Sequence, residues 1–199
     1  MKKMKEFRKI SVIGLGLIAS SICLTLRQKD PTIKMVGYDK NKAVRNRAKK
    51  IGLCKVESNL DNAVSGSQLI ILCVPVGQMQ AVTQRLKKII EPGTTITDVG
   101  SVKLSVIEEI ESNIESVGGK YVPSHPIAGT ERSGPDAGYA GLFEGRWCIL
   151  TPTKKTNKKA LNSVETFWKF LGMQTKIMTP EHHDLVLAVT SHAPHLIAY

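Results

Sequence analysis

Short apolar runs alternate along the chain with longer stretches in which apolar residues recur at helical spacing. The strongest run is Gln68–Val74, and Pro75 ends it. Unbroken apolar runs of this length are typical of strands that are buried on both faces of a parallel sheet. The pattern predicts strands at Lys9–Gly14, Ile33–Tyr38, Gln68–Val74, Thr94–Asp98, Tyr121–Pro123, Arg146–Thr151 and Met173–Met178.

The amphipathic stretches between these runs predict helices. Pro31 ends the first helix and Gly52 ends the second. The predicted helices are Leu17–Lys29, Asn41–Ile51, Asn59–Ser65, Gly77–Ile90, Ser101–Ser116, Lys158–Leu171 and Thr179–Tyr199, and Ile127–Leu142 is a Gly/Pro-rich loop. Strands that alternate with helices in this way indicate an α/β fold with a mainly parallel sheet and helices on both faces.

A glycine motif lies between the first predicted strand and the first predicted helix, with the form Gly-x-Gly-x-x-Ala. Gly14 permits a tight turn, Gly16 lets a pyrophosphate approach the backbone, and Ala19 lets the helix pack closely on the sheet. The amide groups at the start of the helix favour an anion. Strand, turn and helix together predict a Rossmann-like dinucleotide site formed by Gly14, Gly16, Leu17, Ile18 and Ala19.

Three further residues are expected to contact the cofactor. Asp39 ends the second predicted strand, where its carboxylate can bind the ribose hydroxyls of adenosine and repel a 2′-phosphate, which favours NAD over NADP. Val74 and Pro75 follow the strongest strand, and ligands bind at the carboxyl ends of such strands. The purely structural alternative is an ordinary glycine turn, with Asp39 as a helix cap.

Composition narrows the functional classes. The 199 residues include 28 Lys and Arg and 17 Asp and Glu, and a net charge of +11 suits nucleic acid or anionic small molecules. Aromatic residues make up only 5% and are not interleaved with basic ones, so we expect no nucleic-acid partner. The four separated cysteines predict neither a disulfide scaffold nor a thiolate zinc site, and they suit a cytoplasmic protein.

We expect no membrane segment, because no run of about 18 apolar residues is present. The basic start and apolar Ile10–Leu26 resemble a secretory signal. The second predicted strand and Asp39 argue against that interpretation, since a cleaved signal does not lead into a ribose-binding strand.

Two polar side chains follow later strands, at the edge where ligands bind. Ser101 comes after the strand that ends in Asp98, and taken alone it is the natural cap of the next helix. His125 lies between two prolines after another strand, where it suits either a structural role or catalysis.

The remaining histidines gather near the end of the sequence. His192 and His195 are three residues apart and share a helix face unless Pro194 distorts the helix. Together with His182 and His183 they provide pairs but no third ligand, so we predict no metal site.

Four motifs occur in the same order as in the prephenate/arogenate dehydrogenase family of tyrosine biosynthesis, and the chain resembles that family from Lys9 to Tyr199. They are the glycine motif, Asp98-Val99-Gly100-Ser101-Val102-Lys103, Ser124-His125-Pro126-Ile127-Ala128-Gly129-Thr130-Glu131 and Ser191-His192-Ala193-Pro194-His195. The resemblance implies NAD-dependent oxidative decarboxylation of prephenate to 4-hydroxyphenylpyruvate, or the corresponding reaction of arogenate, which gives tyrosine.

The resemblance also implies roles for single residues. His125 accepts the proton of the ring hydroxyl of the substrate, and Ser101 contacts the same hydroxyl and orients the histidine and the cofactor. Thr130 and Glu131 line the substrate pocket, with Glu131 as a gating carboxylate. His195 contacts the substrate.

The family continues beyond this motif order into a helical domain that forms a homodimer and binds the substrate carboxylates. By resemblance we therefore expect an NAD-binding domain over residues 1–178, followed at 179–199 by the first helix of a C-terminally truncated helical domain. The residues alone leave three alternatives open. They are a non-catalytic NAD-binding module, another Rossmann dehydrogenase such as a β-hydroxyacid type, and a nucleic-acid binder that uses the basic patches.

Overall fold

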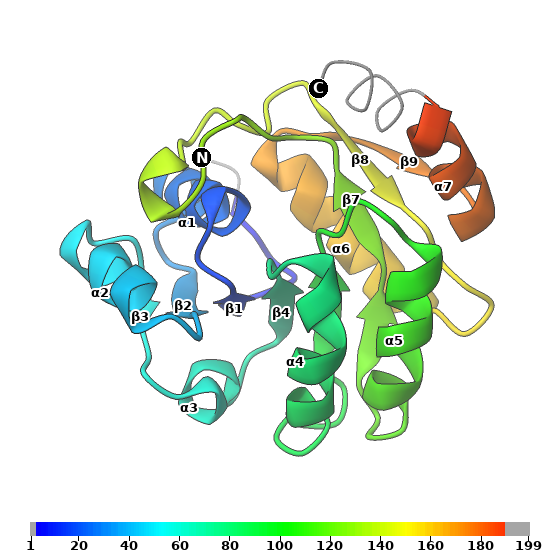
Figure 1. The fold of residues 1–199 in the computed structure, drawn as a ribbon, viewed down its shortest axis with the longest axis horizontal. Coiled ribbons are helices and arrows are strands. Elements are labelled where there is room, and N and C mark those ends of the chain that lie inside the picture. The colour runs from blue at the N-terminus through cyan, green and yellow to red at the C-terminus, as the bar shows by residue number, and fades with distance from the viewer. Residues whose placement is uncertain (1–2, 190–199) are drawn as a thin grey trace.

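A six-stranded parallel sheet forms the centre of the molecule (Figure 1) in a computed structural model that describes residues 3–189. From one edge to the other its strands are β3 (Lys55–Val56), β2 (Lys34–Tyr38), β1 (Lys9–Ile13), β4 (Leu69–Leu72), β5 (Thr95–Asp98) and β6 (Lys120–Val122). This order reverses direction between β1 and β4, which makes a crevice at the carboxyl ends of those strands. The predicted Rossmann-like α/β fold is confirmed.

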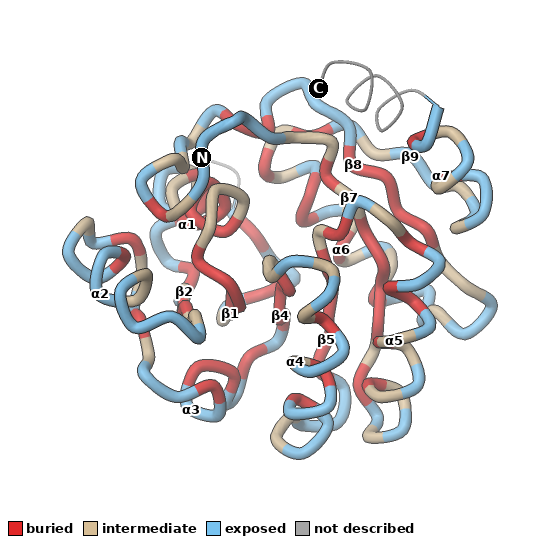
Figure 2. The backbone as a smooth tube through the Cα atoms, viewed as in Figure 1, coloured by how far each residue is buried: buried red, intermediate tan, exposed pale blue. Residues whose placement is uncertain are grey.

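Alternating residues of the central strands point to opposite faces of the sheet. Ile10 and Val12 belong to the core on one face, whereas Ile13 belongs to the core on the other. The first face is covered by α1 (Leu17–Lys29), α2 (Lys42–Lys50) and α6 (Lys158–Leu171), the second by α3 (Leu60–Val64), α4 (Met79–Leu86) and α5 (Leu104–Glu115). Figure 2 shows the buried strands in red between helices whose outer sides are exposed.

A second, three-stranded sheet continues from the end of the first. It contains β7 (Ser124–Pro126), β8 (Trp147–Leu150) and β9 (Gln174–Ile177); β7 and β8 are antiparallel, β8 and β9 parallel. The sequence pattern predicts a single short strand at Tyr121–Pro123. Instead, Pro123 separates β6 from β7, because proline has no N–H for the ladder of hydrogen bonds. His125 therefore lies on the second sheet, just beyond the carboxyl end of β6.

Two helix predictions differ from the structure by more than one residue at an end. The stretch Gly77–Ile90 begins as a 3₁₀ turn, Val76–Gln78, and is α-helical only over α4. The stretch Ser101–Ser116 becomes helical only at Leu104. Of Thr179–Tyr199, the structure describes the start: α7 (Pro180–Leu187), capped by the Thr179 hydroxyl, which accepts a hydrogen bond from the His182 amide.

The predicted loop Ile127–Leu142 packs on α1. The Tyr139 amide donates to the Ser21 hydroxyl over 3.2 Å, and the Thr25 hydroxyl donates to the Ala140 carbonyl over 2.8 Å. Arg47 on α2 forms an ion pair with Asp136 in the short 3₁₀ turn Pro135–Ala137. The loop is thus fixed beside the glycine motif, although it has little regular structure of its own.

None of the helices described within residues 3–189 has both the length and the apolar character needed to span a membrane.

Gly138 is the point at which this loop touches α1. A Cβ atom there would lie 2.9 Å from the backbone nitrogen of Ser21 and would also meet the Ser20 Cβ. We expect Gly138→Ala to lower the free energy of unfolding by about 1–3 kcal/mol, the usual cost of overpacking. Urea unfolding measures this, with Gly129→Ala as the matched control, because a Cβ at Gly129 has nothing within 4 Å. Equal stability of the two variants would show that the loop is not held against α1.

Candidate active site

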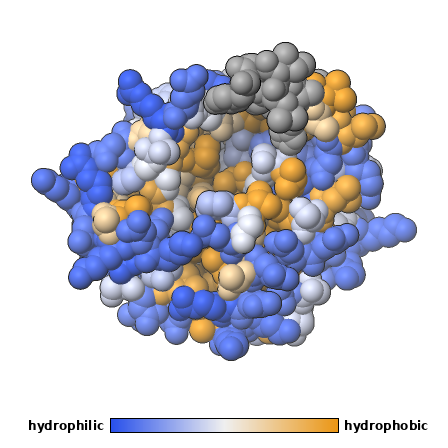
Figure 3. Space-filling view, in the orientation of Figure 1, coloured by the Kyte–Doolittle hydropathy of each residue, from blue (hydrophilic) through white to orange (hydrophobic). Residues whose placement is uncertain are grey.

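A pocket of about 460 Å³ lies at the carboxyl ends of β1, β2 and β4, at the crevice where the strand order reverses. Five of the predicted cofactor residues line it: Gly14, Gly16, Asp39, Val74 and Pro75. In Figure 3 apolar side chains gather in the middle of the face, within a rim of hydrophilic ones. The pocket residues Ile13, Val44 and Val82 are apolar as well, so the pocket offers apolar walls with a few polar groups, the usual character of a small-molecule site.

The two glycines have different physical reasons to be there. Gly14 has φ +91°, and a Cβ on it would lie 2.7 Å from the Cys73 carbonyl oxygen, so β1 and β4 leave no room for a side chain. Gly16 precedes α1, and a Cβ on it would meet nothing within 4 Å. No side chain caps α1, and its first turn carries no acidic residue. Its amides and helix dipole are therefore available to an anion.

Asp39 joins the glycine turn to the end of β2. Its Oδ2 accepts the Leu15 amide over 2.9 Å, and its Oδ1 accepts the Asn41 amide over 2.8 Å. Arg45 donates to the Asp39 carbonyl over 2.6 Å and lies over the Tyr38 ring, 5.7 Å from its centroid. Each carboxylate oxygen keeps a further lone pair, so Asp39 can still accept a ligand hydroxyl.

The other predicted cofactor residues lie in α1. Ala19 is completely buried in the core between α1 and the sheet, consistent with the packing reason for a small residue there. Leu17 and Ile18 are half-buried against the same core and do not line the pocket. A direct contact of these three side chains with a cofactor stays a prediction.

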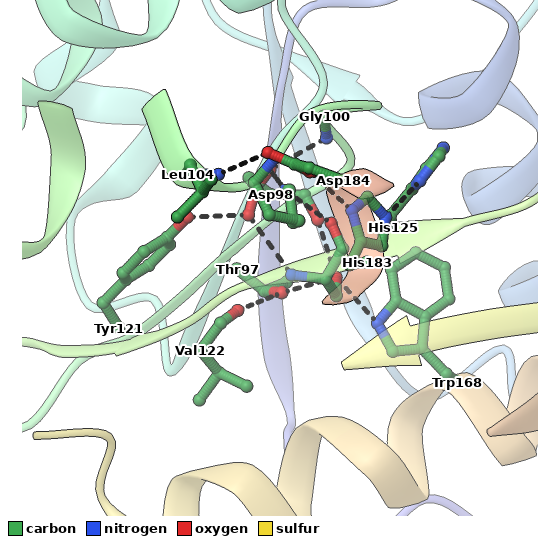
Figure 4. A network of polar contacts seen from close by, with 12 residues as sticks. Thr97, Asp98, Gly100, Leu104, Tyr121, Val122, His125, Trp168, His183 and Asp184 are labelled. Atoms are coloured by element: carbon green, nitrogen blue, oxygen red, sulfur yellow. Dashed lines mark hydrogen bonds and ion pairs between the residues drawn. The ribbon is translucent and has the colours of Figure 1, made fainter. Parts of the chain in front are cut away.

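A buried ion pair lies at the end of β5, where Figure 4 shows Asp98 among its hydrogen-bond partners. Lys103 contacts Asp98, and both side chains are fully enclosed. Asp98 also accepts the Tyr121 hydroxyl and the Gly100 amide, each over 2.8 Å. Burial and the Asp98 charge raise the pKa of Tyr121 well above its ordinary value, so this hydroxyl stays a donor.

The same cluster holds the beginning of β7. The Ser124 hydroxyl donates to the Asp98 carbonyl over 2.6 Å, and Lys103 Nζ donates to the Ser124 carbonyl over 3.0 Å. Trp168 Nε1 of α6 donates to the Ser124 hydroxyl over 3.2 Å. The residue before His125 is therefore fixed from three directions, by β5, α6 and the turn that leads into α5.

His125 faces a second histidine. Its Nδ1 lies 2.9 Å from His183 Nε2, and His183 Nδ1 lies 2.7 Å from Asp184 Oδ1 (Figure 4). Burial lowers the pKa of His183 below its ordinary value of 6.5, against the pull of the Asp184 carboxylate. Burial opposes the ionisation of Asp184, but hydrogen bonds from the Leu104 amide, His183 and the Lys103 amide outweigh it and lower its pKa.

Asp184 also caps α5 across the fold. Its two carboxylate oxygens accept the Lys103 amide over 2.8 Å and the Leu104 amide over 2.9 Å. The interpretation of Ser101 as the helix cap is therefore wrong, since the helix begins three residues later and its orphan amides bind a carboxylate from α7. Ser101 is exposed in the turn between Asp98 and α5.

The remaining predicted site residues are not brought together with His125 in the described structure. Thr130 and Glu131 are exposed and line a separate hollow of about 440 Å³ with Arg132, Ala137 and Tyr139. His195 lies outside the described residues, as does His192. Within residues 3–189 no group of three or more His, Cys, Asp or Glu side chains could hold a metal ion.

Sequence reasoning misses three members of the site: Lys103, His183 and Asp184. Lys103 ends the quoted Asp-Val-Gly-Ser-Val-Lys motif, but nothing in the motif shows that its ammonium is enclosed. His183 is noticed only as a metal-ligand candidate. The one available signal is that an adjacent His-Asp pair follows Thr179-Pro180, a strong helix start, so its position on a short ordered helix could be inferred.

Removing one partner of the buried pair leaves a charge enclosed without a counter-ion. We expect Lys103→Met to lower the free energy of unfolding by about 3–5 kcal/mol. The double variant Asp98→Asn/Lys103→Met should cost less than the sum of the two single variants, because it removes both charges. Chemical unfolding measures all three. Lys155→Met, which removes an exposed ammonium paired with the partly buried Glu111, is the control; a loss for Lys103→Met no larger than the control's would contradict the prediction.

Comparisons with known proteins show which family this chain is similar to. The family described as "Prephenate dehydrogenase, nucleotide-binding domain" matches residues 22–177. The cyclohexadienyl dehydrogenase of Zymomonas mobilis is 42% identical over 197 residues, which are 98% of this chain and 67% of that protein. The prephenate dehydrogenase of Bacillus subtilis is 34% identical over all of this chain and 53% of its own length. The chain thus spans about two thirds of the first relative and about half of the second.

Solved structures of prephenate and arogenate dehydrogenases are also similar to this chain. A prephenate dehydrogenase from Aquifex aeolicus, in complex with hydroxyphenyl propionate and NAD+, superposes with a TM-score of 0.91 and 32% identity, covering 98% of this chain and 68% of that one. The arogenate dehydrogenase of Synechocystis superposes with a TM-score of 0.85 and 28% identity, covering 94% of this chain and 65% of that one.

Proposed function

Since the chain belongs to the prephenate dehydrogenase family, we propose that its site takes part in the NAD-dependent oxidative decarboxylation of prephenate to 4-hydroxyphenylpyruvate. The observation that carries the proposal is the position of His125. This histidine is held beyond the carboxyl end of the sheet by a buried polar network, on the side of the fold to which the nucleotide pocket also opens. Arogenate is the alternative substrate, and the likeness to an arogenate dehydrogenase supports testing it in parallel.

The pocket residues fit NAD. The open space at Gly16 and the uncapped start of α1 suit a pyrophosphate, and Asp39 suits the ribose hydroxyls of adenosine. Val74 and Pro75 form apolar wall at the end of β4. When bound, NAD supplies the redox chemistry as the acceptor of two electrons.

His125 has the protein's main chemical task in this reaction. It takes the proton of the ring hydroxyl as the C–H bond at the same ring carbon gives up its hydrogen with two electrons and carbonyl character develops there. When the bond to carbon dioxide breaks, its electron pair makes the ring aromatic, and the oxygen takes the proton back from the imidazolium as the phenol of the product. A neutral imidazole suits this task, because imidazole is the side chain that can in general take up and release a proton near neutral pH. Positioning by Ser124 and its partners keeps the ring in place, so little reorganisation accompanies the transfer.

Further roles are proposed on the family resemblance. Ser101, exposed in the turn after Asp98, contacts the substrate hydroxyl. Thr130 and Glu131 line the substrate pocket, with Glu131 as its gate. His195 contacts the substrate as well.

The assembly and location of the protein are part of the same proposal. We propose a cytoplasmic enzyme that forms a homodimer, as the family resemblance implies. Leu185 and Val189 are 67% and 66% exposed at and just after α7, and Figure 3 shows an apolar patch beside the grey atoms at this edge. Such a patch supports association, because isolated soluble domains rarely leave large apolar patches exposed.

NAD binding can be tested at Gly16 without disturbing the fold. Gly16 has φ −86° and ψ −164°, which alanine tolerates, and a Cβ there points into open space. Gly16→Ala should keep the melting temperature and weaken the Kd for NAD by about tenfold or more, because the methyl group takes the room of the pyrophosphate. Titration calorimetry measures the Kd. Gly141→Ala is the control, and equal affinity of the two variants would place the cofactor elsewhere.

Turnover is measured by mixing the protein with NAD and prephenate, or NAD and arogenate, and following NADH absorbance. His125→Asn should lower turnover about 10²–10⁴-fold while leaving the Kd for NAD nearly unchanged, because it removes the base and not the pocket. If both quantities fall together, His125 is structural. If neither substrate gives NADH while NAD is bound, in this chain and in any longer form of it, the proposed function is wrong.

A further inference from the structure

We propose that His183 and Asp184 are positioning residues that fix the tautomer of His125, so that Nδ1 carries its proton and Nε2 carries the lone pair that receives the substrate proton. The inference rests on the proposed function for its catalytic meaning. Its structural content, the location of one proton on each ring, stands by itself.

The argument begins at Asp184. An ionised carboxylate is only an acceptor, and Asp184 is held ionised by amide donors from Lys103 and Leu104. The ring nitrogen that faces it, His183 Nδ1 at 2.7 Å, must therefore be the donor. The proton of a neutral His183 is thus on Nδ1.

His183 is neutral because its surroundings disfavour a cation. Its side chain is fully buried, and the Lys103 ammonium lies among the charges that act on it, opposed by Asp98 and Asp184. The pKa of His183 consequently lies below that of an exposed histidine, and its Nε2 carries a lone pair near neutral pH.

The direction of this hydrogen bond then fixes the direction of the next one, between His183 and His125. Because His183 Nε2 can only accept, His125 Nδ1 at 2.9 Å must donate to it. A neutral imidazole has one N–H, so Nε2 of His125 is the basic nitrogen. The two ring planes are inclined at 65° and their centroids lie 5.1 Å apart, so the two rings approach each other through these nitrogens.

The same carboxylate couples the base to the sheet. Asp184 caps α5 at Lys103 and Leu104, and Lys103 in turn bonds Asp98 and the Ser124 carbonyl, next to His125. Both the tautomer of His125 and the backbone position of the strand that carries it therefore depend on Asp184 of α7. When the substrate proton arrives, the imidazolium of His125 is stabilised through His183 by the Asp184 charge, and no atom other than this proton moves between partners.

The tautomers can be read directly by ¹⁵N NMR, since long-range ¹H–¹⁵N correlations of a histidine ring distinguish protonated from bare nitrogens. In the wild-type chain, with NAD present and without turnover, we expect bare Nε2 nitrogens on both His125 and His183. A proton on Nε2 of His125 at neutral pH would overturn the proposal.

Variants at His183 separate positioning from mere packing. His183→Gln keeps an amide oxygen that can accept from His125 Nδ1, whereas His183→Leu offers no acceptor. We expect His183→Leu to release His125 into the other tautomer and to lower kcat at least about tenfold with KM and the Kd for NAD unchanged. His183→Gln should restore the tautomer and bring kcat to within about threefold of wild type.

His182→Gln is the matched control, an exposed histidine on the same helix that takes no part in the network. If His183→Gln and His183→Leu lower kcat equally while His125 keeps its tautomer, the positioning role is wrong. If His183→Leu does not fold, the wild-type and His183→Gln spectra decide the matter. Because the spectra need no turnover, an inactive wild type with the expected tautomers would overturn the proposed function and leave this inference standing.

Discussion

The enclosed ion pair between Asp98 and Lys103 is the interaction on which the rest of the site depends. A charge without solvent must have a partner and further hydrogen bonds, and here the demand is met by atoms from β5, β6, β7 and the turn before α5. Such a pair adds little net stability over an apolar replacement, but it accepts few alternative geometries. It therefore fixes the join between the two sheets, and with it the strand that carries His125, more specifically than apolar packing alone would.

The nucleotide pocket depends on a different constraint, the close approach of β1 and β4. At Gly14 the backbone turns with positive φ directly against the Cys73 carbonyl, so the glycine loop can only follow the end of β4. Asp39 then ties that loop to β2 through the Leu15 amide. The two constraints act on neighbouring strands of one sheet, β4 and β5, whose carboxyl ends lie side by side. A ligand in the pocket and a group at His125 are thus brought to one edge by the sheet itself.

The sequence predicts well those features that depend on residues close together in the chain. The apolar runs, the turn at Gly14 and the carboxylate of Asp39 are such local features. The structure has strands at these runs, and Gly14 and Asp39 line the pocket at the ends of β1 and β2. The failures arise where partners are distant in the chain. The cap of α5 comes from Asp184, 80 residues after Leu104, so the natural local candidate, Ser101, is wrong. His183 meets His125 across 58 residues, and no periodicity encodes that contact. The break at Pro123 has a local cause, but the second sheet that it creates needs β8 and β9.

These distant contacts bear on where the functional unit ends. A division at residue 178, after the last strand, separates a Rossmann-like domain from α7 on grounds of fold. The physical contacts cross that line, because α7 supplies both the acceptor for the His125 ring and the cap of α5. Removal of α7 would leave the amides of Lys103 and Leu104 without the Asp184 carboxylate and would take away the His183 contact of the His125 ring, even with the sheet and the nucleotide pocket intact. The nucleotide pocket and the polar contacts of His125 are therefore built on different lengths of this chain, and the contacts of His125 need the longer one.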